Sequence, residues 1–413
     1  MKEVRMGVIG LGCRGRALLQ TIFACEEARV TAVCDTYADR REETAKSVEE
    51  RYGAAPSVYS DYRALIADPE VDAVLISSSW DWHVRMATDA MRAGKIVALE
   101  VGGAYDLEDC RSLVRTYEET HTPIMMLENC CFDRFELLCE SLYRSGRLGE
   151  VVNCHGAYAH DLRDEVLGGH VNRHYRLENY MRRNCDNYPT HELGPIARIL
   201  DVNRGNAFKT LVSVSSKAVG LEEFAKSDKN PDKSLAGVKF MQGDIVNTII
   251  TCMNGATITL TLDTTLPRYY SREFIVHGTK GMCNQEANLV YLEDDMKAHE
   301  FFEPHMTIGK YLNNAENYSE YLPEEWRKIT EREKELGHGG MDYIMFKSFF
   351  KAVLSGSEMP VDVYDAAAWM SVTALSSMSI AGGGAIQYFP DFTCGKWLMR
   401  KPASVLDLPK VGK

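Results

Sequence analysis

The sequence of 413 residues lacks several features that define common protein classes. It has no run of about 18 or more apolar residues, so no membrane-spanning segment and no membrane partner are expected. It has no basic block, and 47 Lys and Arg against 59 Asp and Glu give a net charge of −12. Nucleic-acid binding through the phosphate backbone is therefore not expected. The N-terminus carries no long apolar segment with a cleavage site, which predicts a cytoplasmic protein.

The twelve cysteines form no CxxC pair and no cluster with histidine at zinc-binding spacing. They are scattered along the chain and lie largely in apolar surroundings. Such cysteines are typical of free, buried thiols in a reducing compartment. We therefore predict no metal site.

What is present is a globular composition, with 45% hydrophobic and 26% charged residues. At roughly 150 residues per domain, the length indicates two or three domains. The pattern of elements changes near residue 148, which predicts one domain over 1–148 and a second over 149–413. The late helices of the second part, over 342–354 and 365–380, are expected to return to the first domain.

A GxGxxG motif at Gly10, Gly12 and Gly15 lies between a buried strand at 4–10 and a helix. The next strand, 29–34, ends at Asp35. This context indicates a dinucleotide site, in which the glycines allow a tight turn, close approach of a pyrophosphate and close helix–strand packing. Asp35 is expected to accept hydrogen bonds from the adenosine ribose, which favours NAD over NADP. Arg40 lies too far along the chain to be the obvious partner of a 2′-phosphate.

Strands and helices keep alternating up to about residue 145, which predicts a parallel, doubly wound sheet. Ligands bind beyond the carboxyl ends of such strands. Further cofactor contacts are therefore expected from residues in the glycine loop and at later strand ends, namely Cys13, Arg14, Ser78, Trp80, His83, Glu100 and Asn129.

From residue 150 onward, strands follow one another with short glycine turns, as at Asn254-Gly255. This pattern predicts a mainly antiparallel sheet, interrupted by one helix over 190–201. Residues 219–242 and 311–337 are polar and aperiodic, and are expected to be loops. An open sheet of this kind favours a homo-oligomer, because a second copy would cover its face.

The stretch Tyr188-Pro189-Thr190-His191 leads into the predicted helix over 190–201. Thr190 is suited to cap it, which places His191 in the first turn. There the helix dipole disfavours a protonated imidazole. A neutral imidazole can act as a base toward a hydroxyl group.

The N-terminal half resembles the Gfo/Idh/MocA oxidoreductase family, which implies a Rossmann dinucleotide-binding domain followed by an α+β domain with a large open sheet. Ordinary members carry Glu-Lys-Pro after the fifth strand, where this chain has Glu100-Val101-Gly102. Val101 cannot take a proton, which weighs against a plain sugar dehydrogenase.

Over residues 4 to 400, the chain instead resembles the NAD-dependent glycosidases of glycoside hydrolase family 109. The resemblance rests on four motifs: 127–131, 158–163, 188–191 and 337–342. It implies that Tyr158 and His191 are catalytic. It also implies that the sugar contacts are Glu128, Arg176, Tyr188 and Tyr270.

The family mechanism implied is a transient oxidation at C3 of the sugar, elimination across C1 and C2, addition of water and re-reduction. No net redox change occurs, and no pair of flanking carboxylates is needed. The substrate expected is a small glycoside of the N-acetylhexosamine type. Glu192 and the divergent region 164–187 depart from the family pattern. A sugar or inositol dehydrogenase with ordinary net redox chemistry is the alternative, followed by a non-catalytic NAD-dependent sensor.

Overall fold

The computed structural model describes residues 3–295 and 309–411, and the chain separates into two compact units. The first unit comprises residues 1–132 and 328–371, and the second comprises residues 133–327 and 372–413. Among the described residues, no helix is both long and apolar enough to cross a membrane.

The first unit is built on a six-stranded parallel sheet in the order β3-β2-β1-β4-β5-β6. Its strands are β1 (Val4–Ile9), β2 (Ala28–Cys34), β3 (Ser57–Tyr59), β4 (Ala73–Ile76), β5 (Ile96–Leu99) and β6 (Ile124–Met126). The inner strands are almost wholly buried, which explains their continuous apolar runs. The order reverses between β1 and β4, and this switch point is where such sheets bind ligands.

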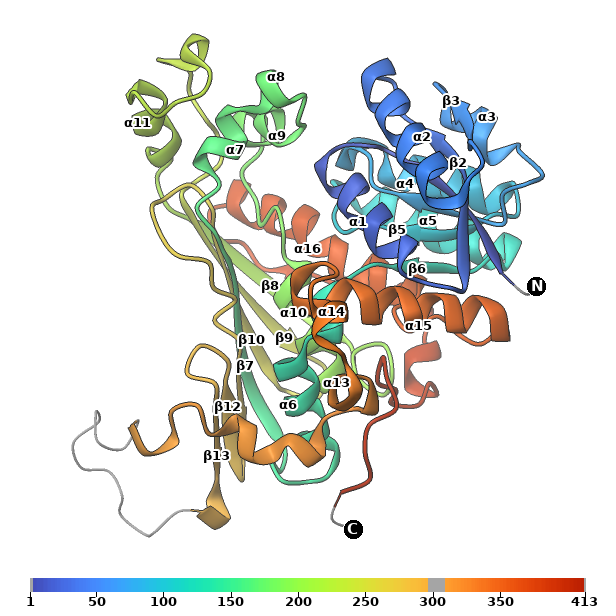
Figure 1. The fold of residues 1–413 in the computed structure, drawn as a ribbon. Coiled ribbons are helices and arrows are strands. Elements are labelled where there is room, and N and C mark those ends of the chain that lie inside the picture. Colours follow the sequence, from blue (N-terminus) through green and yellow to red (C-terminus); the bar gives the residue numbers. More distant parts are fainter. Residues whose placement is uncertain (1–2, 296–308, 412–413) are drawn as a thin grey trace. The chain divides into compact units, whose positions relative to one another are not determined.

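Helices connect these strands in alternation, as the sequence predicts (Figure 1). They are α1 (Cys13–Phe23), α2 (Ala38–Tyr52), α3 (Tyr62–Ile66), α4 (Trp80–Arg92) and α5 (Leu107–Thr120). The late helix α15 (Met341–Ser355) belongs to the same unit and packs against α1 and against the short 3-10 turn η1 (Asn129–Phe132). The predicted parallel, doubly wound sheet is therefore confirmed.

The second unit is built on an eight-stranded sheet in the order β13-β12-β11-β7-β10-β9-β8-β14. Its strands are β7 (Val151–Ala159), β8 (Phe208–Ser215), β9 (Ile245–Cys252), β10 (Thr257–Asp263), β11 (Ile275–Gly278), β12 (Gly281–Asn284), β13 (Leu289–Leu292) and β14 (Gln387–Tyr388). Every neighbouring pair is antiparallel except β7 and β10, which run parallel. The predicted mainly antiparallel sheet is confirmed.

Helices α6 (Arg134–Arg144) and α10 (Thr190–Ile199) pack together, and α10 also lies against β7 and β10 (Figure 1). Close packing is possible because Gly156 of β7 has no side chain. A Cβ at this position would come within 2.5 Å of the Glu192 Cβ on α10. The absence of a side chain at Gly156 therefore sets how closely α10 can pack on β7.

Three expectations about the second unit are wrong. Residues 219–242 contain α11 (Gly220–Lys226), and residues 311–337 contain η4 (Asn314–Tyr321), α13 (Glu324–Lys328) and α14 (Glu331–Lys334). Thr190 does not cap α10. Pro189 occupies the cap position with a helix-like φ of −78°, and no side chain caps the first turn. Thr190 is instead the first helical residue.

The last long helix, α16 (Val363–Ala381), contributes residues to both units. The first unit ends its main segment at Phe132, whereas the sequence places the domain boundary near residue 148. The two divisions differ by the placement of α6 and by the segment 328–371. The boundary at 148/149 stays a prediction about the folding units.

Candidate active site

The glycine loop between β1 and α1 has a conformation that depends on two of its glycines. Gly10 has φ +91°, and a Cβ there would lie 2.6 Å from the Ser77 carbonyl carbon. A Cβ on Gly15 would lie 2.0 Å from the Gly10 carbonyl oxygen. The first glycine therefore makes the turn, and the last lets α1 start directly against it.

Gly12 stands at the start of α1 beside open space. A Cβ added there would meet one atom within 4 Å, the Arg40 Nη1 at 3.6 Å. No side chain caps the first turn of α1, which begins at Cys13. An unobstructed helix N-terminus with a bare glycine before it fits a pyrophosphate, because the backbone N–H groups can approach its oxygens. The residues present therefore fit a dinucleotide.

Asp35, directly after β2, joins the glycine loop to the segment after β2 through its two carboxylate oxygens. One carboxylate oxygen accepts the Leu11 N–H at 2.7 Å, and the other accepts the Tyr37 N–H at 2.9 Å. Arg40 lies closer than the sequence suggests, with Nη1 at 3.8 Å from the Asp35 carboxylate. The negative charge of Asp35 is thus partly balanced by a neighbouring cation.

Arg14 in the glycine loop is held by two carboxylates of the first unit. Its Nε donates to Glu100 at 2.8 Å, and its two terminal nitrogens donate to Asp342 at 2.7 and 3.1 Å. Such a two-point pairing fixes the orientation of the planar guanidinium. The glycine loop, the end of β5 and the start of α15 are therefore joined through one side chain.

Asp342 has two further partners besides Arg14. His338 Nδ1 lies 2.9 Å from its carboxylate, and Asn129 donates to it at 2.8 Å. Although Asp342 is buried, His338 and Arg14 hold its pKa well below the ordinary value. The motif at 337–342 stands out in the sequence, but the sequence gives no role for its aspartate.

The remaining predicted cofactor residues lie at the carboxyl ends of β4 and β5. His83 is buried, with Nε2 at 3.0 Å from the Ser78 carbonyl oxygen and Nδ1 at 3.2 Å from that of Gly102. Burial lowers the pKa of His83. The Trp80 indole packs over Gly102, where a Cβ would come within 2.7 Å of its nitrogen. These residues brace the loop after β5.

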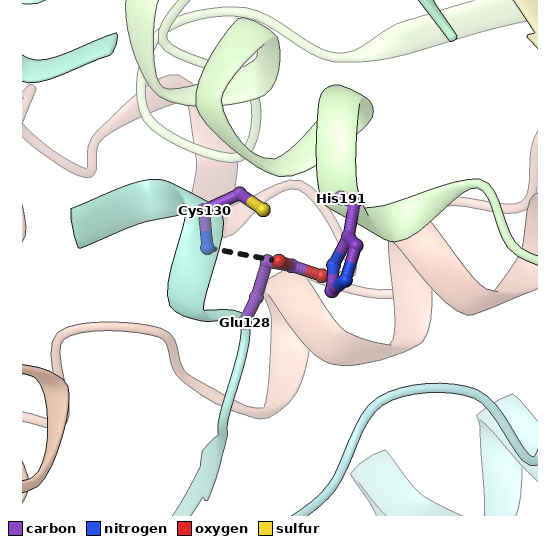
Figure 2. A group of neighbouring side chains, drawn as sticks. All are labelled: Glu128, Cys130 and His191. Carbon is purple, nitrogen blue, oxygen red and sulfur yellow. Dashed lines mark hydrogen bonds between the residues drawn. The ribbon is translucent and has the colours of Figure 1, made fainter. Parts of the chain in front are cut away.

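Glu128 belongs to the first unit, directly after β6, and accepts the Cys130 N–H at 3.1 Å (Figure 2). The other predicted sugar contacts, Arg176, Tyr188 and Tyr270, belong to the second unit together with Tyr158 and His191. Val101 is buried, with 2% of its surface exposed. It offers no group for proton transfer.

In the second unit, Tyr158 near the end of β7 meets Tyr188 and His191 from the start of α10. The ring centroids are 4.3 Å apart for Tyr158 and Tyr188, 4.7 Å for Tyr188 and His191, and 5.5 Å for Tyr158 and His191. Tyr270 adds an edge contact to Tyr158 at 6.4 Å. These four residues form what we call the aromatic cluster. His191 lies in the first turn of α10, as predicted (Figure 2).

Arg176 on α9 (Arg176–Arg182) brings a positive charge to this cluster. Its guanidinium carbon lies 5.2 Å from the Tyr188 ring centroid, and its Nε lies 3.0 Å from Glu165. Burial raises the pKa of Tyr158, while the charge of Arg176 and a hydrogen bond from it act in the opposite direction. A positive group beside a buried phenol favours its ionised form.

A buried carboxyl lies on the segment that leads into α10. Asp186 accepts a hydrogen bond from Thr248 at 3.4 Å, and its own N–H donates to Ser376 at 2.8 Å. Burial raises the pKa of Asp186 to about 7. No sequence pattern points to this residue, because its partners lie on β9 and α16, far away in the chain.

The twelve cysteines are free, and ten are buried. Cys13 and Cys394 are the exposed ones. Burial raises the pKa of several thiols, such as Cys25, Cys34 and Cys185, to about 12. These thiols are therefore protonated and chemically unreactive.

The fold and the glycine loop define a protein with a Rossmann dinucleotide-binding domain and a second, sheet-based domain. Residues 4–127 match the model of the oxidoreductase family with an NAD-binding Rossmann fold, and residues 132–399 match that of the glycosyl hydrolase 109 C-terminal domain. The chain belongs to glycosyl hydrolase family 109 and carries the Gfo/Idh/MocA Rossmann domain.

Relatives span nearly the whole chain. An α-N-acetylgalactosaminidase from Tannerella forsythia is 35% identical over 98% of this chain and 89% of its own length. A glycosyl hydrolase family 109 protein from Solibacter usitatus is 37% identical over 97% of this chain and 90% of its own.

Solved structures show the same fold at low sequence identity. An NAD-binding oxidoreductase from Klebsiella pneumoniae has a TM-score of 0.67 at 16% identity, covering 94% of this chain and 99% of its own. A scyllo-inositol dehydrogenase from Lactobacillus casei has a TM-score of 0.66 at 13% identity, covering 94% and 98%.

Proposed function

We propose that the chain is an NAD-dependent glycosidase that hydrolyses a small glycoside of the N-acetylhexosamine type without net redox change. The observation that carries this proposal is the aromatic cluster, in which Tyr158 and His191 lie 5.5 Å apart by ring centroids. A phenol and an imidazole so close can serve two different protons of one sugar. The similarity to the α-N-acetylgalactosaminidase from Tannerella forsythia supports the choice of substrate class.

The first unit would hold the cofactor through its glycine loop. The α1 N-terminus and Gly12 would receive the pyrophosphate, and Asp35 would receive the adenosine ribose. When bound, NAD would take a hydride from C3 of the sugar and return it at the end, which makes the neighbouring C2 proton acidic in between.

The second unit would move the protons. His191 would accept the proton of the C3 hydroxyl group, and Tyr158 would remove the C2 proton. Arg176 favours negative charge on the Tyr158 oxygen during that step. Tyr270 is 50% exposed, and its ring would offer a surface to the apolar face of a sugar, whereas the buried Tyr188 would hold Tyr158 and His191 in place.

Val101 bears on the choice between a glycosidase and a plain dehydrogenase. A dehydrogenase of the related type uses a lysine at this position for proton transfer, whereas Val101 is buried and apolar. Proton transfer therefore depends on the aromatic cluster. This favours a reaction in which the sugar is deprotonated at carbon as well as at oxygen.

The test is to incubate the purified protein with aryl glycosides of both anomers, without added NAD, and to measure the released phenol. We expect hydrolysis without accumulation of reduced nicotinamide. Reduced nicotinamide in an amount equal to the sugar consumed, with no phenol, would identify a dehydrogenase instead. Bound cofactor with no turnover of any sugar would identify a sensor.

A further inference from the structure

His160 follows β7, two residues after Tyr158, and its ring contacts two tyrosines of the aromatic cluster. Its Nδ1 is 3.5 Å from the Tyr158 hydroxyl oxygen. The ring meets Tyr158 edge-on at 6.1 Å and Tyr270 edge-on at 5.3 Å between centroids. The His160 N–H donates to the Asp263 carbonyl oxygen at 2.8 Å, so its backbone is fixed at the end of the strand pair.

Tyr158 needs a partner if it is to remove a proton from carbon. Its burial keeps the phenol protonated, because burial raises its pKa. Arg176 stabilises a negative oxygen but cannot accept the phenolic proton, since a guanidinium stays charged. The proton must pass to another group as the carbon-bound proton arrives.

The surroundings of His160 keep its imidazole available as an acceptor. Burial lowers its pKa, and Arg176 acts in the same direction. The acids that raise it are Asp161, Asp164 and Glu165. Asp161 is paired with Arg163 at 2.7 Å and Glu165 with Arg176 at 3.0 Å, so two of these three charges are balanced by arginines.

We propose that His160 accepts the phenolic proton of Tyr158, so that the two residues form a proton relay for the C2 position of the sugar. The inference rests on the proposed function and deepens it. His160 acts through Tyr158 and is therefore a positioning residue with a relay role.

The step balances as follows. The C2–H bond of the C3-oxidised sugar breaks and its proton bonds to the Tyr158 oxygen, while the phenolic proton bonds to His160 Nδ1. The electron pair of the C2–H bond becomes the C1–C2 double bond. The C1–O bond to the aglycone breaks, and the aglycone oxygen keeps the electron pair of this C1–O bond. The oxygen then takes a proton from solvent. While the sugar is unsaturated, the Tyr158 and His160 protons exchange with solvent. Water then adds its hydroxyl group at C1 and releases its other proton to solvent, Tyr158 gives a solvent-derived proton to C2, and His160 returns a proton to Tyr158.

The principal variant is His160→Asn, which keeps a polar atom near the Nδ1 position but cannot take a proton. We expect turnover and the incorporation of deuterium at C2 from heavy water both to fall by about 100-fold. In the wild type, activity should be lost as pH falls below the ordinary histidine pKa of 6.5, because burial lowers the pKa of His160 and protonation then blocks the relay. The variant should lose the contribution of His160 to this acid limb. The content of bound NAD should not change.

His155→Asn is the matched control. His155 lies on the same strand, three residues before Tyr158 and hence on the opposite face, where it pairs with Glu273 at 3.2 Å. Its turnover and pH profile should equal those of the wild type. A second variant, His160→Ala, should regain activity with added imidazole, which a purely structural role would not allow.

The outcomes separate the relay from the proposed function. A wild type that hydrolyses glycosides and exchanges C2, beside a His160→Asn variant with the same rate and acid limb, would overturn the relay alone. Absence of imidazole rescue in a folded His160→Ala protein would also count against it. A wild type that neither hydrolyses nor exchanges would remove the proposed function and the relay with it.

Discussion

The two units organise their functional residues by opposite means. Around the glycine loop, the first unit holds its residues by charged interactions. Arg14 forms ion pairs with Glu100 and Asp342, and Asp35 accepts a hydrogen bond from the backbone of the loop. The second unit uses rings: Tyr158, Tyr188 and His191 meet face and edge, with Arg176 beside them. The first arrangement suits a charged, retained ligand, and the second suits a neutral ligand that must enter and leave.

Substitutions in the second unit should have the largest effect on activity. Tyr158→Phe and His191→Ala should each lower glycoside turnover by about 100-fold to 10,000-fold, because each removes a proton-transfer group. The content of bound NAD should stay at the wild-type level in both. Tyr269→Phe, at an exposed neighbouring tyrosine, is the control. Wild-type turnover in both variants would remove Tyr158 and His191 from the site.

The matching change in the first unit is Asp342→Asn. It removes one of the two carboxylates that pair with Arg14, so we expect NAD to dissociate about ten times faster and the free energy of unfolding to fall by about 2 kcal/mol. Cofactor release by dilution and thermal unfolding measure the two effects. Glu43→Gln, which breaks the exposed pair with Arg16, should change neither. Unchanged cofactor release in Asp342→Asn would show that the network does not serve the cofactor.

Two glycine variants separate the shape of the loop from its contact with the ligand. Gly15→Ala places a Cβ against the Gly10 carbonyl oxygen and should cost about 1–3 kcal/mol of stability. Gly12→Ala meets open space, so stability should hold while NAD affinity falls. Calorimetry of folding and of NAD binding distinguishes them. Equal NAD affinity in Gly12→Ala and the wild type would place the pyrophosphate elsewhere.

The last prediction concerns Asp186 and the change of stability with pH. Its pKa of about 7 lies above the ordinary value of 3.8, so the folded chain keeps a proton that the unfolded chain releases. Stability should therefore decrease as pH rises from about 4 to about 7, by up to about 1.4 kcal/mol per pH unit. Asp186→Asn should show a flatter dependence of Tm on pH. Thr248→Val should instead extend the dependence to higher pH, because it removes a hydrogen bond that lowers the pKa of Asp186. An unchanged slope in Asp186→Asn would assign it to another group.

The sequence predicts the first unit well because its signals are local. The glycine spacing, the apolar strands and the acid after β2 all lie within about thirty residues of one another. Helix α2 is not predicted from the sequence. It buries only Thr44 and Val48, so its apolar residues show too little periodicity. The pairing of Arg14 with Asp342 joins positions 328 residues apart, which no local pattern could indicate.

In the second unit, motifs point to Tyr158 and His191, but their meeting depends on how α10 crosses β7. That crossing is set by Gly156 opposite Glu192, a contact visible only in three dimensions. The role that we infer for His160 and the raised pKa of Asp186 are likewise not visible in the sequence, because each depends on neighbours that only folding brings close. The predicted N-cap at Thr190 is wrong because Pro189, directly before the helix, occupies the cap position.

The central claim is that the second unit deprotonates the sugar at C2 while the cofactor of the first unit ends unchanged. It is tested most directly by turning over an aryl glycoside in heavy water, without added NAD, and analysing the released sugar by NMR. The account predicts deuterium at C2 in every molecule of product. Released sugar that carries only protium at C2 would contradict it.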